Sequence, residues 1–107
     1  ALESLTFTKT IAEGTAIKKP IRLTKILDIL KKTNGGCLAV TEEEILKATL
    51  DLSKNGFFVE PTCASAAVGL EKLRAKNLIQ SDETTVVVLT GSGLKSSDFF
   101  TENFELQ

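Results

Sequence analysis

The sequence predicts an α/β fold, a partial three-layer αβα arrangement in which a parallel sheet lies between helices. Three observations favour it. Helical and extended patterns alternate along the chain, which is typical of parallel strands joined by right-handed helical crossovers. Residues 84–89 form a continuous run rich in β-branched side chains, as in strands that are covered on both faces. The predicted helices end at Asn or Asn-Gly, which tolerate the left-handed conformation found beyond a helix.

The composition is that of one globular domain over residues 1–107, and it excludes several classes of protein. The chain carries 13 basic and 14 acidic side chains, a formal net charge of −1, and 42% of its residues are hydrophobic. A disordered chain would be poorer in apolar residues, and a chain that binds nucleic acid through phosphates would usually be basic. No apolar run approaches the roughly 20 residues that span a bilayer. We therefore expect neither nucleic acid nor a membrane as a partner.

The residue types that the chain lacks limit the catalytic and metal sites that it can form. His is absent, which excludes a Ser–His or Cys–His pair and removes the commonest zinc ligand, so no metal site is expected. The two cysteines, Cys37 and Cys63, are too far apart in sequence for a CxxC motif. A disulfide between them stays open, although two thiols in an average composition favour a reducing, cytoplasmic setting.

The first predicted helix follows an extended segment at residues 5–11. Pro20 lies near its first turn, and the Asn-Gly-Gly at 34–36 ends it. Its apolar residues follow the i, i+3, i+4, i+7 pattern of one helix face: Leu23, Ile26, Leu27 and Leu30.

The second predicted helix follows a short apolar strand at 37–40 and ends at the Asn-Gly of 55–56. Thr41 and Glu44 have the spacing of a capping box, in which each side chain accepts a hydrogen bond from the backbone N–H of the other. One face of the helix carries Ile45, Ala48, Thr49 and Leu52.

A short strand at 57–59 and a turn precede the third predicted helix, for which Thr62 is a plausible N-cap. Small side chains at 63–69 allow a close approach to a neighbouring element, and the helix stops near Asn77. The strand at 84–89 follows. The tail at 96–107 holds half of the six phenylalanines of the chain: Phe99, Phe100 and Phe104.

Two local patterns are candidates for a functional site. The predicted strand at 84–89 leads into Gly91-x-Gly93, and glycine turns at the carboxyl end of a parallel strand let a backbone approach a ligand. A dinucleotide fingerprint is excluded because only eleven residues follow Ser96, and a Walker A loop because its GxxxxG frame is absent. Glu60 ends another predicted strand at the same edge. For both patterns the alternative interpretation, a tight turn that binds no ligand, is not excluded.

Four segments, taken in order, resemble threonine synthases and threonine dehydratases. They are TIAEGTAI at 10–17, GCLAVTEEEI at 36–45, GFFVEPTCASA at 56–66 and VVVLTGSGLK at 86–95. The last segment, with Thr before the first glycine and Leu-Lys after the second, is closer to the synthases. These enzymes use pyridoxal phosphate and belong to the tryptophan-synthase-β type, known as fold type II.

The resemblance implies a site. The hydroxyl of Thr90 would approach the pyridine nitrogen of pyridoxal phosphate, and Gly91 and Gly93 would let the backbone pass close to its ring. Glu60 would lie near the cofactor pocket, and Glu13 would lie at the rim of the substrate pocket. Threonine synthases convert O-phosphohomoserine and water to threonine and phosphate, so the parent protein would be a lyase of threonine biosynthesis.

The chain also departs from that family. Its Schiff-base lysine and phosphate-binding loop lie N-terminal of this region, and no segment here matches them. The resemblance therefore implies the C-terminal part of the large domain, with Gln107 a natural end and Ala1 not a natural start. Such a fragment would be inactive alone, would not hold pyridoxal phosphate tightly, and would pair with its missing N-terminal part or with itself. The alternatives are a free-standing binding or assembly module, a split-enzyme partner, or a fragment of a threonine dehydratase.

Overall fold

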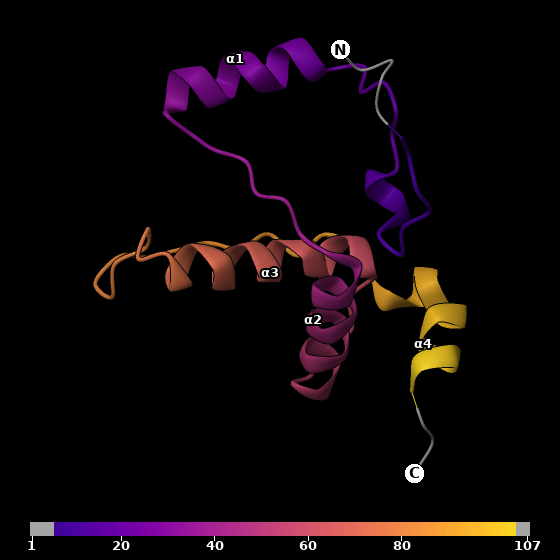
Figure 1. Ribbon diagram of the computed structural model, residues 1–107. Coiled ribbons are helices and arrows are strands. Elements are labelled where there is room, and N and C mark those ends of the chain that lie inside the picture. Colours follow the sequence, from indigo (N-terminus) through magenta and orange to yellow (C-terminus); the bar gives the residue numbers. More distant parts are fainter. Residues whose placement is uncertain (1–5, 105–107) are drawn as a thin grey trace.

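The computed structural model describes residues 6–104, and most of its regular structure is helical (Figure 1). The 3₁₀ turns and helices, in chain order, are η2 (Glu13–Thr15), α1 (Leu23–Thr33), α2 (Glu42–Lys54), α3 (Pro61–Ala75), η3 (Gly93–Ser96) and α4 (Ser97–Asn103). Helices α2 and α3 pack against each other, η2 lies against α3, and α4 follows η3 directly. Within the described range no helix has the length and apolar character needed to cross a membrane.

The predicted sheet does not form among residues 6–104. Val59 makes a single antiparallel bridge with Ser92, and no backbone hydrogen bond joins residues 84–89 to any other described segment. Residues 37–40 are likewise unpaired as a strand, and position 5 of the first predicted strand lies outside the described residues. Strands are stabilised by hydrogen bonds to neighbouring strands. The parallel sheet therefore stays a prediction for this chain in contact with further strands.

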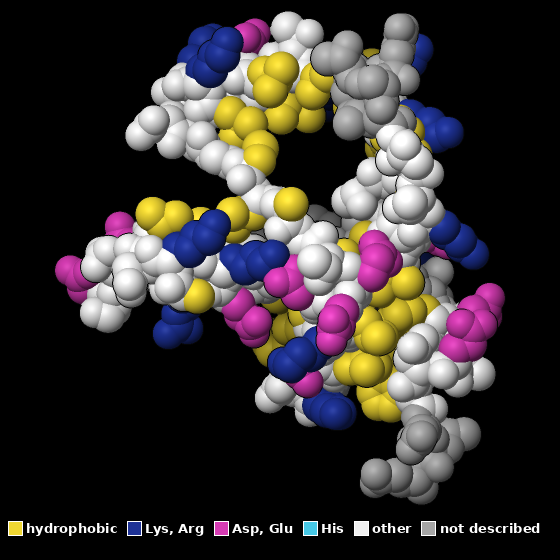
Figure 2. Space-filling view, in the orientation of Figure 1, with side chains coloured by type: hydrophobic (Ala, Val, Ile, Leu, Met, Phe, Trp, Pro, Cys, Tyr) yellow, Lys and Arg dark blue, Asp and Glu magenta, His cyan; other side chains and the backbone are white. Residues whose placement is uncertain are grey.

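Helix α1 is confirmed, but it packs against little. Its C-cap Asn34 has the left-handed φ of 53°, as the Asn-Gly-Gly sequence predicts. No residue of α1 is buried. Hydrophobic side chains of α1 border the hollow between this helix and α3 (Figure 2). The apolar stripe that the sequence predicts is therefore present without a covering element.

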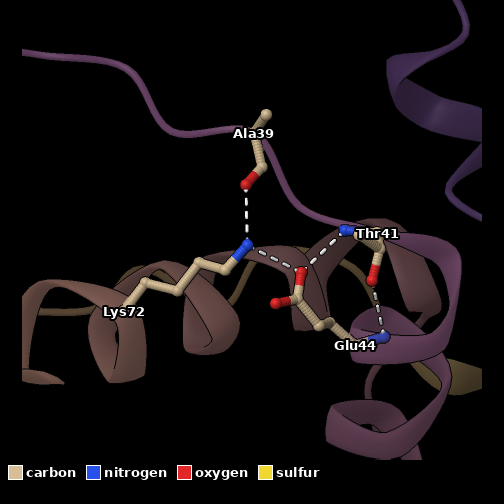
Figure 3. Close-up of polar contacts among 4 residues, drawn as sticks. All are labelled: Ala39, Thr41, Glu44 and Lys72. Carbon is tan, nitrogen blue, oxygen red and sulfur yellow. Dashed lines mark hydrogen bonds and ion pairs between the residues drawn. The ribbon is translucent and has the colours of Figure 1, made fainter.

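The capping box of α2 is confirmed, and a third side chain extends it (Figure 3). The backbone N–H of Thr41 donates to Glu44 Oε2 at 2.7 Å, and the backbone N–H of Glu44 donates to Thr41 Oγ1 at 3.3 Å. Lys72 of α3 donates to the same Glu44 oxygen at 2.8 Å and to the carbonyl oxygen of Ala39 at 2.9 Å. Lys72 thereby ties the segment before α2 to α3.

The hydrogen bonds of Glu44 predict that its contribution to stability depends on pH. The hydrogen bonds from Lys72 and Thr41 lower the pKa of Glu44 below its ordinary value of 4.5. A lowered folded-state pKa means that the contribution to stability is present above the unfolded pKa and is lost as pH falls through the folded pKa. Glu44→Gln is therefore expected to lower the melting temperature at pH 7, and this effect is expected to shrink as the pH falls below 4.5. Glu43→Gln is the control, and equal effects of both variants at pH 7 would contradict the assignment.

The core lies between α2 and α3. On α2, Ile45 and Thr49 are buried, and the Thr49 hydroxyl donates to the carbonyl oxygen of Ile45 at 2.7 Å. On α3, Ala64 and Val68 are buried, and the small side chain of Ala64 lets the helices approach closely. The face of α2 that the sequence predicts to be apolar is thus the face that packs on α3.

The start of α3 corrects one prediction. Glu60, not Thr62, occupies the N-cap, and Pro61 is the first helical residue, where its missing N–H costs no hydrogen bond. The Thr62 hydroxyl instead accepts a hydrogen bond from the backbone N–H of Gly14 at 3.0 Å. A side chain at Gly14 would put its Cβ 2.9 Å from Thr62 Cγ2. Thr62 therefore holds η2 against α3.

The described part of the phenylalanine-rich tail packs on the chain itself. Phe100 of α4 is buried, with its ring centroid 4.5 Å from that of Phe58. Phe99 and Phe104 lie against Phe100 at 5.2 and 6.1 Å. Phe100 is therefore not available as a contact between chains. Residues 105–107 of the predicted tail lie outside the described residues.

Candidate functional site

The residues before α3 and those before η3 run antiparallel to each other. The backbone N–H of Glu60 donates to the carbonyl oxygen of Gly91 at 3.1 Å, and that of Gly93 donates to the carbonyl oxygen of Phe58 at 3.0 Å. Four of the predicted site residues are therefore neighbours: Glu60, Thr90, Gly91 and Gly93. We call this group, together with Cys63, the α3 junction.

The two glycines of the junction make room for side chains of the same chain. A Cβ at Gly91 would meet the carboxylate of Glu60, with its Oε1 at 1.8 Å. A Cβ at Gly93 would lie 2.9 Å from atoms of the Phe58 and Phe100 rings. The carboxylate of Glu60 thus lies directly against the backbone that follows Thr90.

Thr90 is fixed through its backbone while its side chain stays accessible. Its N–H donates to Cys63 Sγ at 3.0 Å, and Cys63 is buried in the first turn of α3. The residue as a whole is exposed, and no hydrogen bond joins its hydroxyl to another residue within 6–104. A hydroxyl on a fixed backbone can donate to, or accept from, a ligand without first giving up another partner.

Glu13 lies elsewhere, in a cleft of about 580 Å³ between the N-terminal segment and α4. Lys95 and Glu42 line the same cleft, whereas the junction residues Glu60 and Thr90 do not. The carboxylate of Glu42 accepts hydrogen bonds from the Thr10 hydroxyl and, at 2.8 Å, from the backbone N–H of Ile11. This pair of bonds fixes the segment that leads to Glu13.

Sequence reasoning missed two members of these sites. Cys63 was considered only for a CxxC motif, a disulfide or a free thiol, although the run of small side chains at 63–69 indicated that another segment could lie close to α3. Lys95 was part of the glycine motif at 86–95 but was not assigned to a site, and no local pattern connects it to Glu13, because their segments are far apart in sequence and meet only in the folded chain.

Comparisons with known proteins match most of the chain to one family of enzymes. Residues 2–91 match the family model described as pyridoxal-phosphate dependent enzyme. The threonine synthase of Methanocaldococcus jannaschii is 43% identical over 91 residues, which cover 84% of this chain and 22% of that protein. The threonine synthase of Methanosarcina acetivorans is 40% identical over 88 residues, covering 81% of this chain and 22% of that protein.

A plant protein gives the same result. Threonine synthase 2, chloroplastic, of Arabidopsis thaliana is 37% identical over 86 residues, which cover 80% of this chain and 17% of that protein. The chain thus spans about a fifth of the length of these curated relatives.

Proposed function

The chain belongs to the pyridoxal-phosphate-dependent enzymes, and from this premise we propose that it is part of a threonine synthase, forming one wall of its cofactor site. The observation that carries the proposal is the match to threonine synthases from two archaea and a plant over at least 80% of this chain. The substrate class would be O-phosphohomoserine, with threonine and phosphate as products. The T-G-S-G-L-K at 90–95 supports a synthase over a dehydratase, and we assign the chain to the C-terminal part of the large domain.

Two features of Thr90 in the α3 junction support its proposed place beside a pyridine ring. Thr90 as a residue is exposed, and its backbone N lies 3.0 Å from Cys63 Sγ, so its hydroxyl could hydrogen-bond the pyridine nitrogen at little entropic cost. A neutral hydroxyl, unlike a carboxylate, does not require that nitrogen to be protonated. Bound pyridoxal phosphate supplies an electron sink for negative charge at the substrate carbon. Thr90 would orient the ring, and Glu60 would place a carboxylate beside it.

A chimera tests the proposed function. This chain replaces the aligned segment of the M. jannaschii threonine synthase, and the products formed from O-phosphohomoserine are measured with pyridoxal phosphate present. Threonine and phosphate are expected in equal amounts, while the 107-residue chain alone is expected to form neither. A folded chimera that binds pyridoxal phosphate but makes neither product would contradict the proposal. Deamination of threonine to 2-oxobutyrate would instead indicate a dehydratase.

Self-association of the isolated chain is also expected, because its predicted strand has an uncovered face. Val86 is 81% exposed and Val88 is 68% exposed. An apolar groove of about 280 Å³ lies beside them, between α3 and residues 85–88. Exposed, unpaired segments of this kind associate with other strands and apolar surfaces. In a whole enzyme we assign this face to the part of the domain that the chain lacks.

Light scattering over a range of concentrations measures the association. The mean mass is expected to rise with concentration, and the double variant Val86→Lys/Val88→Lys is expected to stay monomeric. Ile21→Lys is the matched control, because Ile21 is also exposed but lies outside this face. A wild-type chain that stays monomeric at millimolar concentration would contradict the expectation.

A further inference from the structure

The backbone of Thr90 and Gly91 is held by two hydrogen bonds to the start of α3, one to a side chain and one to the backbone. The N–H of Thr90 donates to Cys63 Sγ, and the carbonyl oxygen of Gly91 accepts from the backbone N–H of Glu60. Residues 60 and 63 are themselves joined, because the N–H of Cys63 donates to the carbonyl oxygen of Glu60 at 2.9 Å. The two bonds lie on either side of the Thr90–Gly91 peptide, and together they fix the place of this short stretch of backbone.

The helical turn that makes these bonds is among the most buried parts of the chain. Cys63 is 4% exposed, Ala64 is fully buried, and Pro61 is among the fully buried side chains. Pro61 also has a restricted φ, which makes the first turn stiff. Side chains in such a setting have little freedom to move, so the sulfur atom is a fixed acceptor.

We propose that this first turn of α3 is the positioning element for Thr90, with Cys63 as its positioning residue. The inference rests on the proposed function, in which Thr90 contacts the cofactor ring. Cys63 does not itself reach the ligand in this assignment. It sets the place of the Thr90 backbone, and hence the direction in which the hydroxyl points.

Two substitutions of Cys63 separate the effect of its hydrogen-bond acceptor from the effect of its side-chain volume. Serine keeps a hydrogen-bond acceptor on the same Cβ, and valine, which is somewhat larger than cysteine, fills the site without one. In the isolated chain, loss of one hydrogen bond is expected to speed amide hydrogen exchange at Thr90 by about 2- to 13-fold in Cys63→Val. Cys63→Ser is expected to stay within about twofold of wild type. Cys37→Val is the control, because Cys37 is exposed.

The exchange measurement does not depend on the proposed function. Amides of α2 report whether each variant is folded, and Cys63→Ala replaces Cys63→Val if the larger side chain unfolds the chain. Unchanged exchange at Thr90 in a folded variant without an acceptor would overturn the inference, whatever the enzyme does.

The second measurement uses the chimera and a double-mutant cycle. If Cys63 acts through Thr90, Cys63→Val is expected to lower kcat by about 2- to 13-fold, and adding Thr90→Val is expected to lower it no further. Cys63→Ser is expected to restore kcat. The absorbance maximum of bound pyridoxal phosphate is expected to shift alike in both valine variants. If the fold losses in kcat of Cys63→Val and Thr90→Val multiply in the double variant, the positioning role is overturned. A wild-type chimera without activity would overturn only the proposed function.

Discussion

Replacing Ile45 by alanine is expected to lower the free energy of unfolding by about 2–5 kcal/mol, the cost of truncating a buried aliphatic side chain. Ile45 is 3% exposed and lies on the same face of α2 as Ala48 and Leu52, which pack against the buried Cys63 and Ala64 of α3. Its carbonyl oxygen also accepts the hydroxyl of Thr49, so the backbone there cannot shift freely to fill a cavity. The α2–α3 pair supports the α3 junction, which makes this loss the largest that we expect from a single substitution.

Urea unfolding followed by circular dichroism measures it. Ile29→Ala is the control, since Ile29 is exposed on α1, and its effect is expected to stay within about 0.5 kcal/mol. Similar losses in the two variants would mean that α2 and α3 do not form the stable core.

Gly91→Ala is expected to lower the free energy of unfolding by about 1–3 kcal/mol, as overpacking usually does. The new Cβ would lie 1.8 Å from Glu60 Oε1 and 2.6 Å from its Cγ, so the whole Glu60 side chain must move. The φ of Gly91 lies outside the left-handed region, and the effect is therefore steric. Displacing Glu60 is also expected to change the cofactor environment in the chimera.

A double variant and a control separate this effect from a general cost of alanine. Gly91→Ala/Glu60→Ala is expected to recover most of the lost stability, because the clashing side chain is gone. Gly69→Ala, in α3, meets no atom within 4 Å and is expected to stabilise by about 0.5–1 kcal/mol. An equal loss in the single and double variants would contradict the close contact between residues 60 and 91.

Local motifs in the sequence were enough to predict α1, α2 and α3, whereas α4 lies in the tail, for which no helix was predicted. The capping box of Thr41 and Glu44 and the left-handed Asn34 each depend on residues within one turn, so their geometry follows from local chemistry. The prediction that Thr62 is the N-cap of α3 was wrong. The Thr62 side chain has a partner 48 positions away, Gly14, that no local pattern reveals. The sheet could not be tested in the same way, because a strand needs neighbouring strands as partners.

The sequence was enough to predict most of the residues that belong to the candidate site, but not how they contact one another. Glu60, Thr90 and Gly91 could be singled out from glycines and an acid at the ends of predicted strands, and the structure makes them neighbours. The contact between Thr90 and Cys63 could not, because it joins residues 27 positions apart through a buried sulfur atom. Glu13, which the resemblance places at the rim of the substrate pocket, lines a cleft together with Lys95, and its role stays a prediction.

The most direct test of the account is kcat of the chimera that carries Thr90→Val. If the hydroxyl contacts the pyridine nitrogen, kcat is expected to fall by about 2- to 13-fold, the loss of one hydrogen bond of about 0.5–1.5 kcal/mol, with the melting temperature unchanged. Thr90→Ser keeps the hydroxyl and is expected to retain activity. An unchanged kcat together with a lower melting temperature would make Thr90 a structural residue and would contradict its place at the cofactor.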